Sequence, residues 1–347
     1  MTSICFFNNK GGVGKTTLVC NMGSFLASQF SKRVLLLDLD PQCNSTQLVL
    51  GEERLVTMFD ADGGTGDRTL LQVVEPLLMG ESNVSPESVT PVAPHENRFG
   101  IALIPGHPRV AMIEDKLGAD WGDIAGGDIG AFRRANWFNS VVEFFSSDYD
   151  MILVDVGPSL GALNRSVLIG SHYLLTPMGC DIFSLIGIGN IAEWLVAWFD
   201  RYSVGMDQLR RASAAAVARY KLVADFDARC RLLGYTVQQY ITKSKGGVRR
   251  PTEAYESIRQ RIPETIASKL NKLIDPRREG MLDLGDIPHM YSLVPLSQSA
   301  SAPIDKLTNK DGLAGSQYQK QVEYMGVIEG LCKRLLRSLD ATESEAD

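Results

Sequence analysis

The stretch from residue 3 to residue 17, SICFFNNKGGVGKTT, constrains the fold of this chain more than any other. Its apolar start predicts a strand, its glycines predict a tight turn, and the periodic apolar residues after Lys15 predict a helix. A glycine loop in this context lets backbone N–H groups converge on phosphate oxygens, with the positive end of the helix dipole behind them. A purely structural glycine turn is the alternative, but the spacing favours a phosphate-binding loop.

The loop predicts a site for a nucleoside triphosphate with Mg²⁺. In loops of this kind the lysine reaches the β- and γ-phosphates, which assigns Lys15, and the following hydroxyl ligates Mg²⁺, which assigns Thr16. We expect the nucleotide to be held by the loop and the first helical turn, which comprise Gly11, Gly12, Val13, Gly14, Lys15, Thr16 and Thr17.

A second lysine, Lys10, precedes the first glycine, where an ordinary phosphate loop requires none. With this residue the sequence resembles the ParA/MinD family of deviant Walker A ATPases, whose signature is KGGxGK[TS], and is closest to its ParA-like partition branch. The resemblance implies an ATP-sandwiched homodimer in which Lys10 of one copy contacts the nucleotide of the other. A solvated lysine beside the loop is the structural alternative.

Two aspartates follow the apolar run 34–37, which is typical of a strand buried on both faces. Asp38 and Asp40 are two positions apart, so they point to the same side at the carboxyl edge of the sheet, where ligands bind. The segment resembles the family motif DxDPQGNxS. By that resemblance Asp40 positions the attacking water and is catalytic with Lys10 and Lys15, and Asp38 lies near the magnesium shell. Cys43 replaces the usual glycine, so the motif does not determine the geometry of the local turn.

A third motif is the apolar run 151–154 followed by Asp155. It is typical of a Walker B strand, whose acid holds a water on Mg²⁺. The family commonly has DxPPS here, and Gly157 stands at the first proline. Near the C-terminus, the segment PLSQSASAP resembles the family segment that flanks the nucleotide base, which implies that Pro295 contacts the base.

Composition limits the class of protein. The chain has 347 residues, 44% of them hydrophobic and 22% charged, which are globular values. A net charge of −6 gives no overall attraction to nucleic acid or anionic lipid. Six scattered cysteines without a CxxC pair favour free thiols over disulfides or a metal site. The sequence starts directly with a strand, and no uninterrupted apolar run approaches the roughly 18 residues of a spanning helix, so we expect a cytoplasmic protein.

We expect one α/β domain over residues 1–340, with a mostly parallel, twisted sheet flanked by helices on both faces. The family resemblance covers roughly residues 1–50, 100–200 and 231–338. Insertions are expected at about 51–98, 201–230 and 275–290, and an acidic disordered tail at 341–347. Further expectations are a helix at 131–147, an extra helix or helical hairpin within 201–230, a last strand at 291–295 and a closing helix at 315–339.

A basic glycine loop is the candidate DNA-binding surface. It contains Lys243, Lys245, Arg249 and Arg250, with Arg259 and Arg261 on the following helix. Phosphate contacts require only local positive charge, and a dimer would double the patch. The family resemblance implies non-specific DNA binding, partition of DNA or another cargo, and slow hydrolysis stimulated by a ParB-like or other adaptor protein. A solvated basic loop is the alternative.

Three other functions were weighed. A regulatory switch that docks a dedicated partner through the insertions, as in a mobile element or defence system, is the second hypothesis. Membrane association is unlikely, because a final apolar stripe more often packs on the sheet and the acidic tail repels anionic lipid; this stripe comprises Val327, Ile328, Leu331, Leu335 and Leu336, beside Lys333, Arg334 and Arg337. An iron–sulfur scaffold needs paired cysteines, which the sequence lacks.

Overall fold

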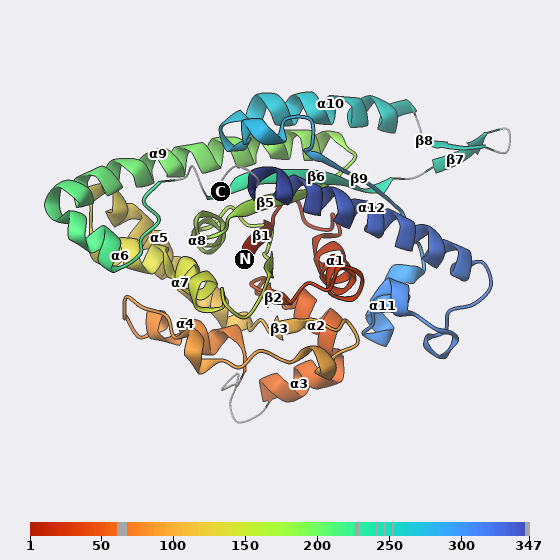
Figure 1. Cartoon of the computed structure of the whole chain (residues 1–347), viewed down its shortest axis with the longest axis horizontal. Coiled ribbons are helices and arrows are strands. Elements are labelled where there is room, and N and C mark those ends of the chain that lie inside the picture. The colour runs from red at the N-terminus through yellow and green to blue at the C-terminus, as the bar shows by residue number, and fades with distance from the viewer. Residues whose placement is uncertain (61–67, 226–228, 241, 246–247, 252, 344–347) are drawn as a thin grey trace.

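The computed structural model describes residues 1–60, 68–225, 229–240, 242–245, 248–251 and 253–343. A seven-stranded sheet crosses the molecule in the order β3-β2-β4-β1-β5-β6-β9 (Figure 1). Every pairing in this sheet is parallel, which confirms the predicted α/β class. The strands are β1 (Thr2–Phe6), β2 (Val34–Asp38), β3 (Ala102–Ile104), β4 (Met151–Asp155), β5 (Tyr173–Gly179), β6 (Arg231–Tyr240) and β9 (Asp283–Pro288).

The central strands are apolar because both of their faces are covered. Leu35 and Leu37 of β2 belong to one buried cluster, whereas Leu36 belongs to the cluster on the opposite face. Successive side chains of a strand alternate between faces, so a continuous apolar run fills both layers.

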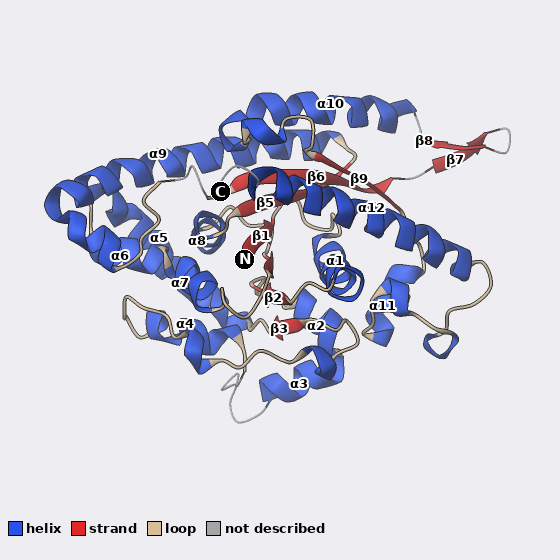
Figure 2. Ribbon diagram, viewed as in Figure 1, coloured by secondary structure: helices blue, strands red, loops and turns tan. Residues whose placement is uncertain are grey.

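Two layers of helices enclose the sheet, and Figure 2 shows the strands between them. The first layer contains α1 (Lys15–Phe30), α2 (Asn44–Leu50), α11 (Leu293–Ala300) and α12 (Gln317–Glu343), with α3 (Glu52–Asp60) beside α2. The second contains α4 (Leu70–Leu78), α5 (Ile113–Asp123), α6 (Ile129–Ala135), α7 (Trp137–Phe144), α8 (Ala162–Gly170), α9 (Ile182–Arg219) and α10 (Glu253–Lys269). This arrangement leaves the carboxyl ends of the strands open for a ligand.

The last strand is β9 at 283–288, so the prediction of a strand at 291–295 was wrong. Part of the segment 275–290, which we expected to be an insertion, therefore forms an edge of the sheet. The sequence of β9, DLGDIP, contains glycine, proline and two acids, which are rare in strands. Its pairing with β6, rather than a local preference, places it in the sheet.

Two helices also differ from expectation. The helix expected at 131–147 is divided into α6 and α7 at Asn136, whose amide donates to the Phe132 carbonyl and to the Tyr202 hydroxyl. The helical segment expected within 201–230 is the continuation of α9, which departs from helical geometry only at Ser213. Residues 226–228 of that segment lie outside the described part.

Helix α9 has the length and composition of a membrane-spanning helix, with a mean hydropathy of 1.6 over its most apolar 18 residues. The expectation that no such segment exists considered only uninterrupted apolar runs. In the structure Leu195, Tyr202 and Leu209 of α9 are buried in the core, as in the core helix of a globular protein.

The closing helix α12 extends to Glu343, a few residues beyond the expected end at 339. Residues 344–347 of the expected acidic tail lie outside the described residues. Residues 61–67 of the expected insertion at 51–98 do so as well, while the rest of that insertion contributes α3 and α4.

Candidate active site

The glycine loop contains backbone positions that favour glycine. Gly12 and Gly14 have φ values of +72° and +78°, in the left-handed region, where a side chain is strained. Gly14 is the N-cap of α1, so the first N–H groups of this helix face the loop. Asn8 holds the start of the loop, since its Oδ1 accepts from the Lys10 N–H at 2.9 Å and its Nδ2 donates to the Pro177 carbonyl of β5 at 2.7 Å.

Two cavities meet at this loop. The larger, about 530 Å³, is lined by Gly12, Gly14, Lys15, Thr16, Thr17, Asn44, Gln47, Leu48, Val294 and Gln298. The second, about 300 Å³, is lined by Gly14, Thr17, Leu18, Gln238, Ile287, Pro288, His289, Met290, Tyr291, Val294, Pro295, Ile304 and Tyr324. Gly14, Thr17 and Val294 belong to both, so the cavities are adjacent. We call the first cavity the phosphate cleft, because the glycine loop lines it, and the second the base cleft, because Pro295 lines it.

Pro295 lines the second cavity, and its contact with a nucleotide base stays a prediction. The sequence did not reveal the other walls of this cavity, among them Gln238, Tyr291 and Tyr324. These residues come from β6, from the turn before α11 and from α12, which are far apart in the chain. Only the correct pairing of β9 with β6 would have brought them together.

Asp155 and Asp38 end neighbouring strands and lie opposite each other in the register of β4 and β2. Asp155 Oδ2 accepts from the Thr16 hydroxyl at 2.7 Å and from the Ser45 hydroxyl at 2.6 Å. Its other oxygen, Oδ1, is buried and has no hydrogen-bond partner among the described residues. Ser45 is a site residue that the sequence analysis missed.

Burial raises the pKa of both carboxyl groups. The pKa of Asp38 is raised to about 8, first by burial and then by the charge of Asp155. The pKa of Asp155 is also raised by burial, although the Ser45 and Thr16 hydroxyls oppose the shift. Two buried carboxyl groups of this kind are stabilised as anions when a cation binds beside them.

The residues at this point fit Mg²⁺. The Thr16 hydroxyl adjoins Asp155, whose Oδ1 has an open acceptor site. Mg²⁺ takes oxygen ligands and is commonly bound by one or two side chains, water and substrate phosphates. Within the described residues no three His, Cys, Asp or Glu side chains form a complete metal cluster, so phosphate and water would supply the other ligands.

Asp38 lies next to Asp155, but its oxygens accept from the protein itself. Asp38 Oδ2 accepts from the Thr46 N–H at 2.7 Å and from the Thr46 hydroxyl at 2.6 Å. The same hydroxyl accepts from the Gly106 N–H at 2.8 Å. Asp38 thus joins the end of β2 to α2 and to the exit of β3, which positions the second motif.

The carboxylate of Asp40 faces the loop that follows Asp155. A Cβ atom at Gly157 would lie 3.3 Å from Asp40 Oδ1, so the glycine at this position leaves room for Asp40. Cys43 has a φ of +54°, a left-handed conformation that glycine adopts without strain. The turn therefore forms here with cysteine in a conformation that favours glycine.

Two residues that the sequence analysis missed hold the loop 157–161. Asn164 Nδ2 donates to the carbonyls of Gly157 and Ser159, both at 2.7 Å. Glu114 accepts from the N–H groups of Ala162 and Leu163 at the start of α8. These contacts fix the backbone beside Asp40 from two separate helices.

Lys10 forms an ion pair within its own chain, with 2.5 Å between its Nζ and Asp181 Oδ2. The sequence analysis expected Lys10 to point towards a second copy. Asp181 is the N-cap of α9 and also accepts from the N–H of Ser184. Partial burial alone would raise the pKa of Asp181, but the hydrogen bonds from Lys10 and Ser184 lower it below its ordinary value.

An apolar surface lies beside this ion pair. It consists of Ile182, Phe183 and Ile186 in the first turns of α9, and we call it the α9 patch. Their exposed fractions are 43%, 69% and 53%. Large apolar side chains that gather on a surface mark an interaction site more often than isolated ones do.

The basic DNA-binding candidates lie on a two-stranded antiparallel hairpin rather than a loop. Its strands are β7 (Thr242–Lys245) and β8 (Val248–Pro251). Lys243 pairs with Arg250, and Arg249 pairs with Ser244. In Figure 1 the hairpin projects from the rest of the molecule. The structure thus brings all four candidates, Lys243, Lys245, Arg249 and Arg250, into one element.

The two further basic candidates on α10 differ from each other. Arg261 is exposed. Arg259 is bound by Asp283 and by Asp286, the latter at 2.9 Å, so its charge is already neutralised within the protein. The proposal that Arg259 contributes to a free cationic surface is therefore corrected.

The apolar stripe considered for membrane binding is part of the core. Ile328, Leu331 and Leu335 are at most 1% exposed and pack in the cluster between α12 and the sheet. Arg334 donates to the Leu284 carbonyl of β9, which holds α12 on the sheet. The stripe does not face solvent, as an interfacial helix would require.

Comparisons with known proteins agree with this site. Residues 1–202 match the family model described as an AAA domain. The chromosome partitioning protein ParA of Caulobacter vibrioides is 31% identical over 188 residues, which cover 53% of this chain and 58% of that protein. The chromosome-partitioning ATPase Soj of Treponema pallidum is 32% identical over 188 residues, which cover 54% and 60%. The chain thus spans about three-fifths of the length of these relatives.

A solved structure extends the similarity over most of the fold. A protein of Corynebacterium diphtheriae is 35% identical and superposes with a TM-score of 0.71, covering 87% of this chain and 97% of that one. The family model covers more than half of the chain, and the phosphate cleft is lined by the loop and by Asn44 of the second motif, while Thr16 and Ser45 donate to the buried Asp155 at the end of β4. The chain belongs to the ParA-like family of P-loop ATPases.

Proposed function

We propose that this protein is a Mg²⁺-dependent ATP hydrolase that acts as an ATP-sandwiched homodimer and couples its cycle to DNA binding and to the positioning of DNA or another cargo. The observation that carries the proposal is the pair of adjacent cavities at the phosphate loop, the larger of which is lined by Lys15 and by Thr16, whose hydroxyl donates to the buried Asp155. A cleft of this composition suits a purine nucleoside triphosphate.

The proposed reaction is in-line attack of water on the γ-phosphate, which releases ADP and phosphate. Lys15 and the loop N–H groups neutralise the charge that develops on the phosphate oxygens. Thr16 and Asp155 would hold Mg²⁺, which would supply positive charge to offset that of the β- and γ-phosphates. Asp40 positions the attacking water, and Asn164 keeps the adjacent loop in place.

The dimer is proposed from Lys10 and the α9 patch. The Lys10–Asp181 pair is more than a third exposed on each side. A pair of this kind contributes only about 0.2–1 kcal/mol, so a partner's nucleotide phosphates can redirect Lys10 at small cost. Burial of Ile182, Phe183 and Ile186 against a second copy would stabilise the closed form.

A direct test compares the wild type with Lys10→Ala in a slowly hydrolysed ATP analogue, measured by light scattering after size exclusion. We expect the wild type to double its mass and Lys10→Ala to stay monomeric while still binding nucleotide. A wild type that remains monomeric at every concentration, or a variant that dimerises normally, rules out the sandwich. Asp40→Ala should accumulate as the ATP-bound dimer with little phosphate release.

DNA binding is proposed through the β7–β8 hairpin. Fluorescence anisotropy at low salt should show weaker binding of a random duplex by the double variant Arg249→Glu and Arg250→Glu. A matched control, Arg211→Glu with Lys310→Glu, changes the net charge equally at exposed positions elsewhere. Equal losses in both variants would reject the hairpin as the DNA surface.

The competing hypothesis is a regulatory switch that docks a dedicated protein. It predicts an ATP-dependent dimer that does not bind DNA and whose turnover rises only with that protein. We also propose a cytoplasmic, nucleoid-associated location, which accords with six free cysteines. Slow basal turnover that an adaptor protein stimulates is expected under either hypothesis.

A further inference from the structure

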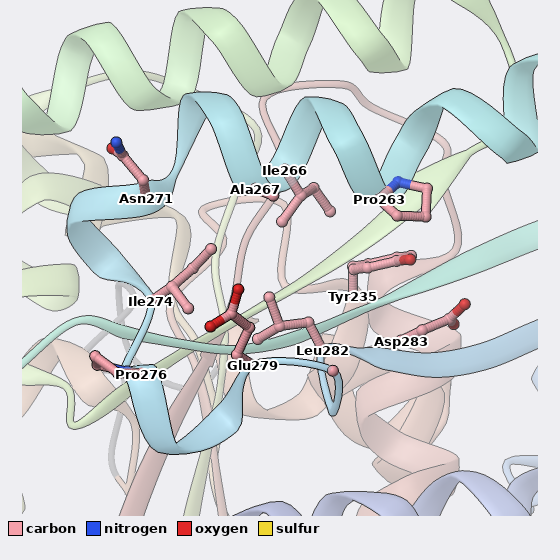
Figure 3. A pocket seen from close by; sticks show the side chains of 11 residues that line it. Tyr235, Pro263, Ile266, Ala267, Asn271, Ile274, Pro276, Glu279, Leu282 and Asp283 are labelled. Carbon is pink, nitrogen blue, oxygen red and sulfur yellow. The ribbon is translucent and has the colours of Figure 1, made fainter.

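A separate cavity of about 450 Å³ lies between α10 and the start of β9 (Figure 3). It is lined by Tyr235, Pro263, Ile266, Ala267, Asn271, Ile274, Pro276, Glu279, Gly280, Leu282 and Asp283. None of these residues lines the phosphate or base cleft. The base cleft lies further along the same two strands, at Gln238 of β6 and Ile287 of β9.

The walls of this cavity are mainly apolar. Figure 3 shows Ile266, Ile274 and Leu282 surrounding the space from α10, from the segment after it and from the residue just before β9. Pro263, Ala267 and Pro276 extend the apolar lining. The cavity opens to solvent, and a volume of this size lined mainly by apolar side chains with a few polar groups is typical of a small-molecule site.

The charge of the lining has one sign. Glu279 and Asp283 are acidic, and none of the lining residues, all of which the structure describes, is basic. Asp283 is already bound by Arg259 and by the N–H of Gly285. Glu279 is exposed at the edge of the cavity and has no hydrogen bond or ion pair in the described part of the chain, and Figure 3 shows its carboxylate pointing towards α10 between Ile274 and Leu282.

We propose that this cavity binds a small organic cation, in which an apolar body fills the space between Ile266, Ile274 and Leu282 and a protonated amine pairs with Glu279. A neutral ligand of the same shape would gain only the apolar contacts. An anion of the same shape would face the unpaired Glu279 carboxylate. The proposal does not depend on ATP hydrolysis, because the cavity shares no residue with the nucleotide clefts.

The test uses three probes with one skeleton: 4-phenylbutylamine, 4-phenylbutanol and 4-phenylbutyrate. Each is titrated at pH 7 into the full chain labelled at isoleucine δ1 methyl groups. We expect the Ile266 and Ile274 signals to move most readily with the amine, less with the alcohol and least with the acid. The Ile287 signal, in the base cleft, should stay in place. Ile274→Val assigns one of the two reporter signals.

Two variants locate the interaction. Glu279→Gln should weaken amine binding about twofold to fivefold, the range of a partly exposed ion pair, and leave the alcohol unaffected. Glu264→Gln, an exposed carboxylate on α10 outside the lining, is the matched control and should change neither affinity. Ala267→Phe places a ring in the cavity and should remove binding of all three probes.

The outcomes are decisive in both directions. Equal affinity for the acid and the amine, an unchanged amine affinity in Glu279→Gln, or a shift confined to Ile287 overturns the proposal. Because Ala267 is exposed on α10, its replacement is expected to leave the melting temperature within a few degrees of the wild type. Should Ala267→Phe unfold, Glu279→Gln and the three-probe order still decide.

Discussion

The two ends of the parallel sheet hold different kinds of polar group. At the carboxyl ends of β2 and β4, buried carboxyl groups have raised pKa values, and Asp155 Oδ1 lacks a partner among the described residues. At the amino ends, Ser3 and His172 exchange hydrogen bonds between β1 and β5, and Arg33 binds Asp150 at 2.7 Å. These amino-end groups are paired with each other, whereas at the carboxyl end one carboxylate oxygen, Asp155 Oδ1, is left for a ligand. This difference separates residues that stabilise the fold from residues that act on a nucleotide.

The largest expected effect is at the phosphate loop. Lys15→Ala should reduce phosphate release by about 100-fold or more, because it removes the cation beside the reacting phosphate. Since Lys15 ends in the phosphate cleft, the melting temperature should change little. Phosphate release and nucleotide binding are measured together with thermal unfolding. Lys32→Ala, at the amino end of β2, is the control and should turn over normally.

Asp155→Asn should lower the affinity for Mg²⁺, measured from the turnover, by about 10- to 100-fold. This is the usual effect of altering a group that holds a metal through water. The same substitution should not lower the free energy of unfolding. The substitution removes a buried charge that raises the pKa of Asp38, so the nucleotide-free protein should be equally or more stable at neutral pH. Magnesium titrations of turnover and urea unfolding provide the two measurements. A variant that loses stability and keeps its magnesium affinity would show that Asp155 stabilises the fold, as the residues at the amino ends of the strands do.

His172 provides the corresponding prediction for the amino end. Burial, followed by the charge of Arg229, lowers the pKa of His172 to about 4, so the folded protein holds it neutral. The unfolded chain takes up the proton near pH 6.5, so this stability is complete above pH 6.5 and is lost as the pH falls towards 4. The difference amounts to about 3 kcal/mol in the free energy of unfolding.

His172→Asn keeps an acceptor near Ser3 and removes the titration. Its free energy of unfolding should vary less between pH 6.5 and 4 than that of the wild type, with normal turnover at pH 7. Asp38 has the opposite effect on the pH dependence of stability, and it acts at higher pH. Its raised pKa favours the protonated form in the fold, so its contribution is present below about pH 4 and is lost as the pH rises through about 8. Unfolding curves over the full pH range separate the two contributions.

Much of the carboxyl end could be predicted because its chemistry lies in short segments. Lys15, Asp38 and Asp155 each follow or precede an apolar run whose local pattern predicts the element. The strand–loop–helix order then places all three at one edge. The parallel sheet and its helical layers follow from the same patterns.

The rest depends on contacts between distant segments. β9 has a weak strand sequence and is placed by its pairing with β6. The base cleft needs residues of β6, the turn before α11 and α12, and Lys10 meets an aspartate 171 positions away. Such contacts depend on the three-dimensional packing, which the hydrophobic periodicity of a single segment does not predict. For the same reason the sequence analysis missed Asn164 and Glu114.

The smallest expected effect concerns an ion pair at each end of the sheet. Lys10–Asp181, beyond the carboxyl end of β5, competes with the proposed role of Lys10 in a second copy's site, whereas Arg33–Asp150 has no such competitor. Asp181→Asn should therefore strengthen nucleotide-dependent dimerisation by about twofold to fivefold, the worth of a partly exposed pair. Asp150→Asn should leave dimerisation unchanged and lower stability slightly. Sedimentation velocity with the ATP analogue measures both. If Asp181→Asn weakens the dimer instead, Asp181 orients Lys10 for the partner rather than restraining it, and this pair belongs to the assembled site.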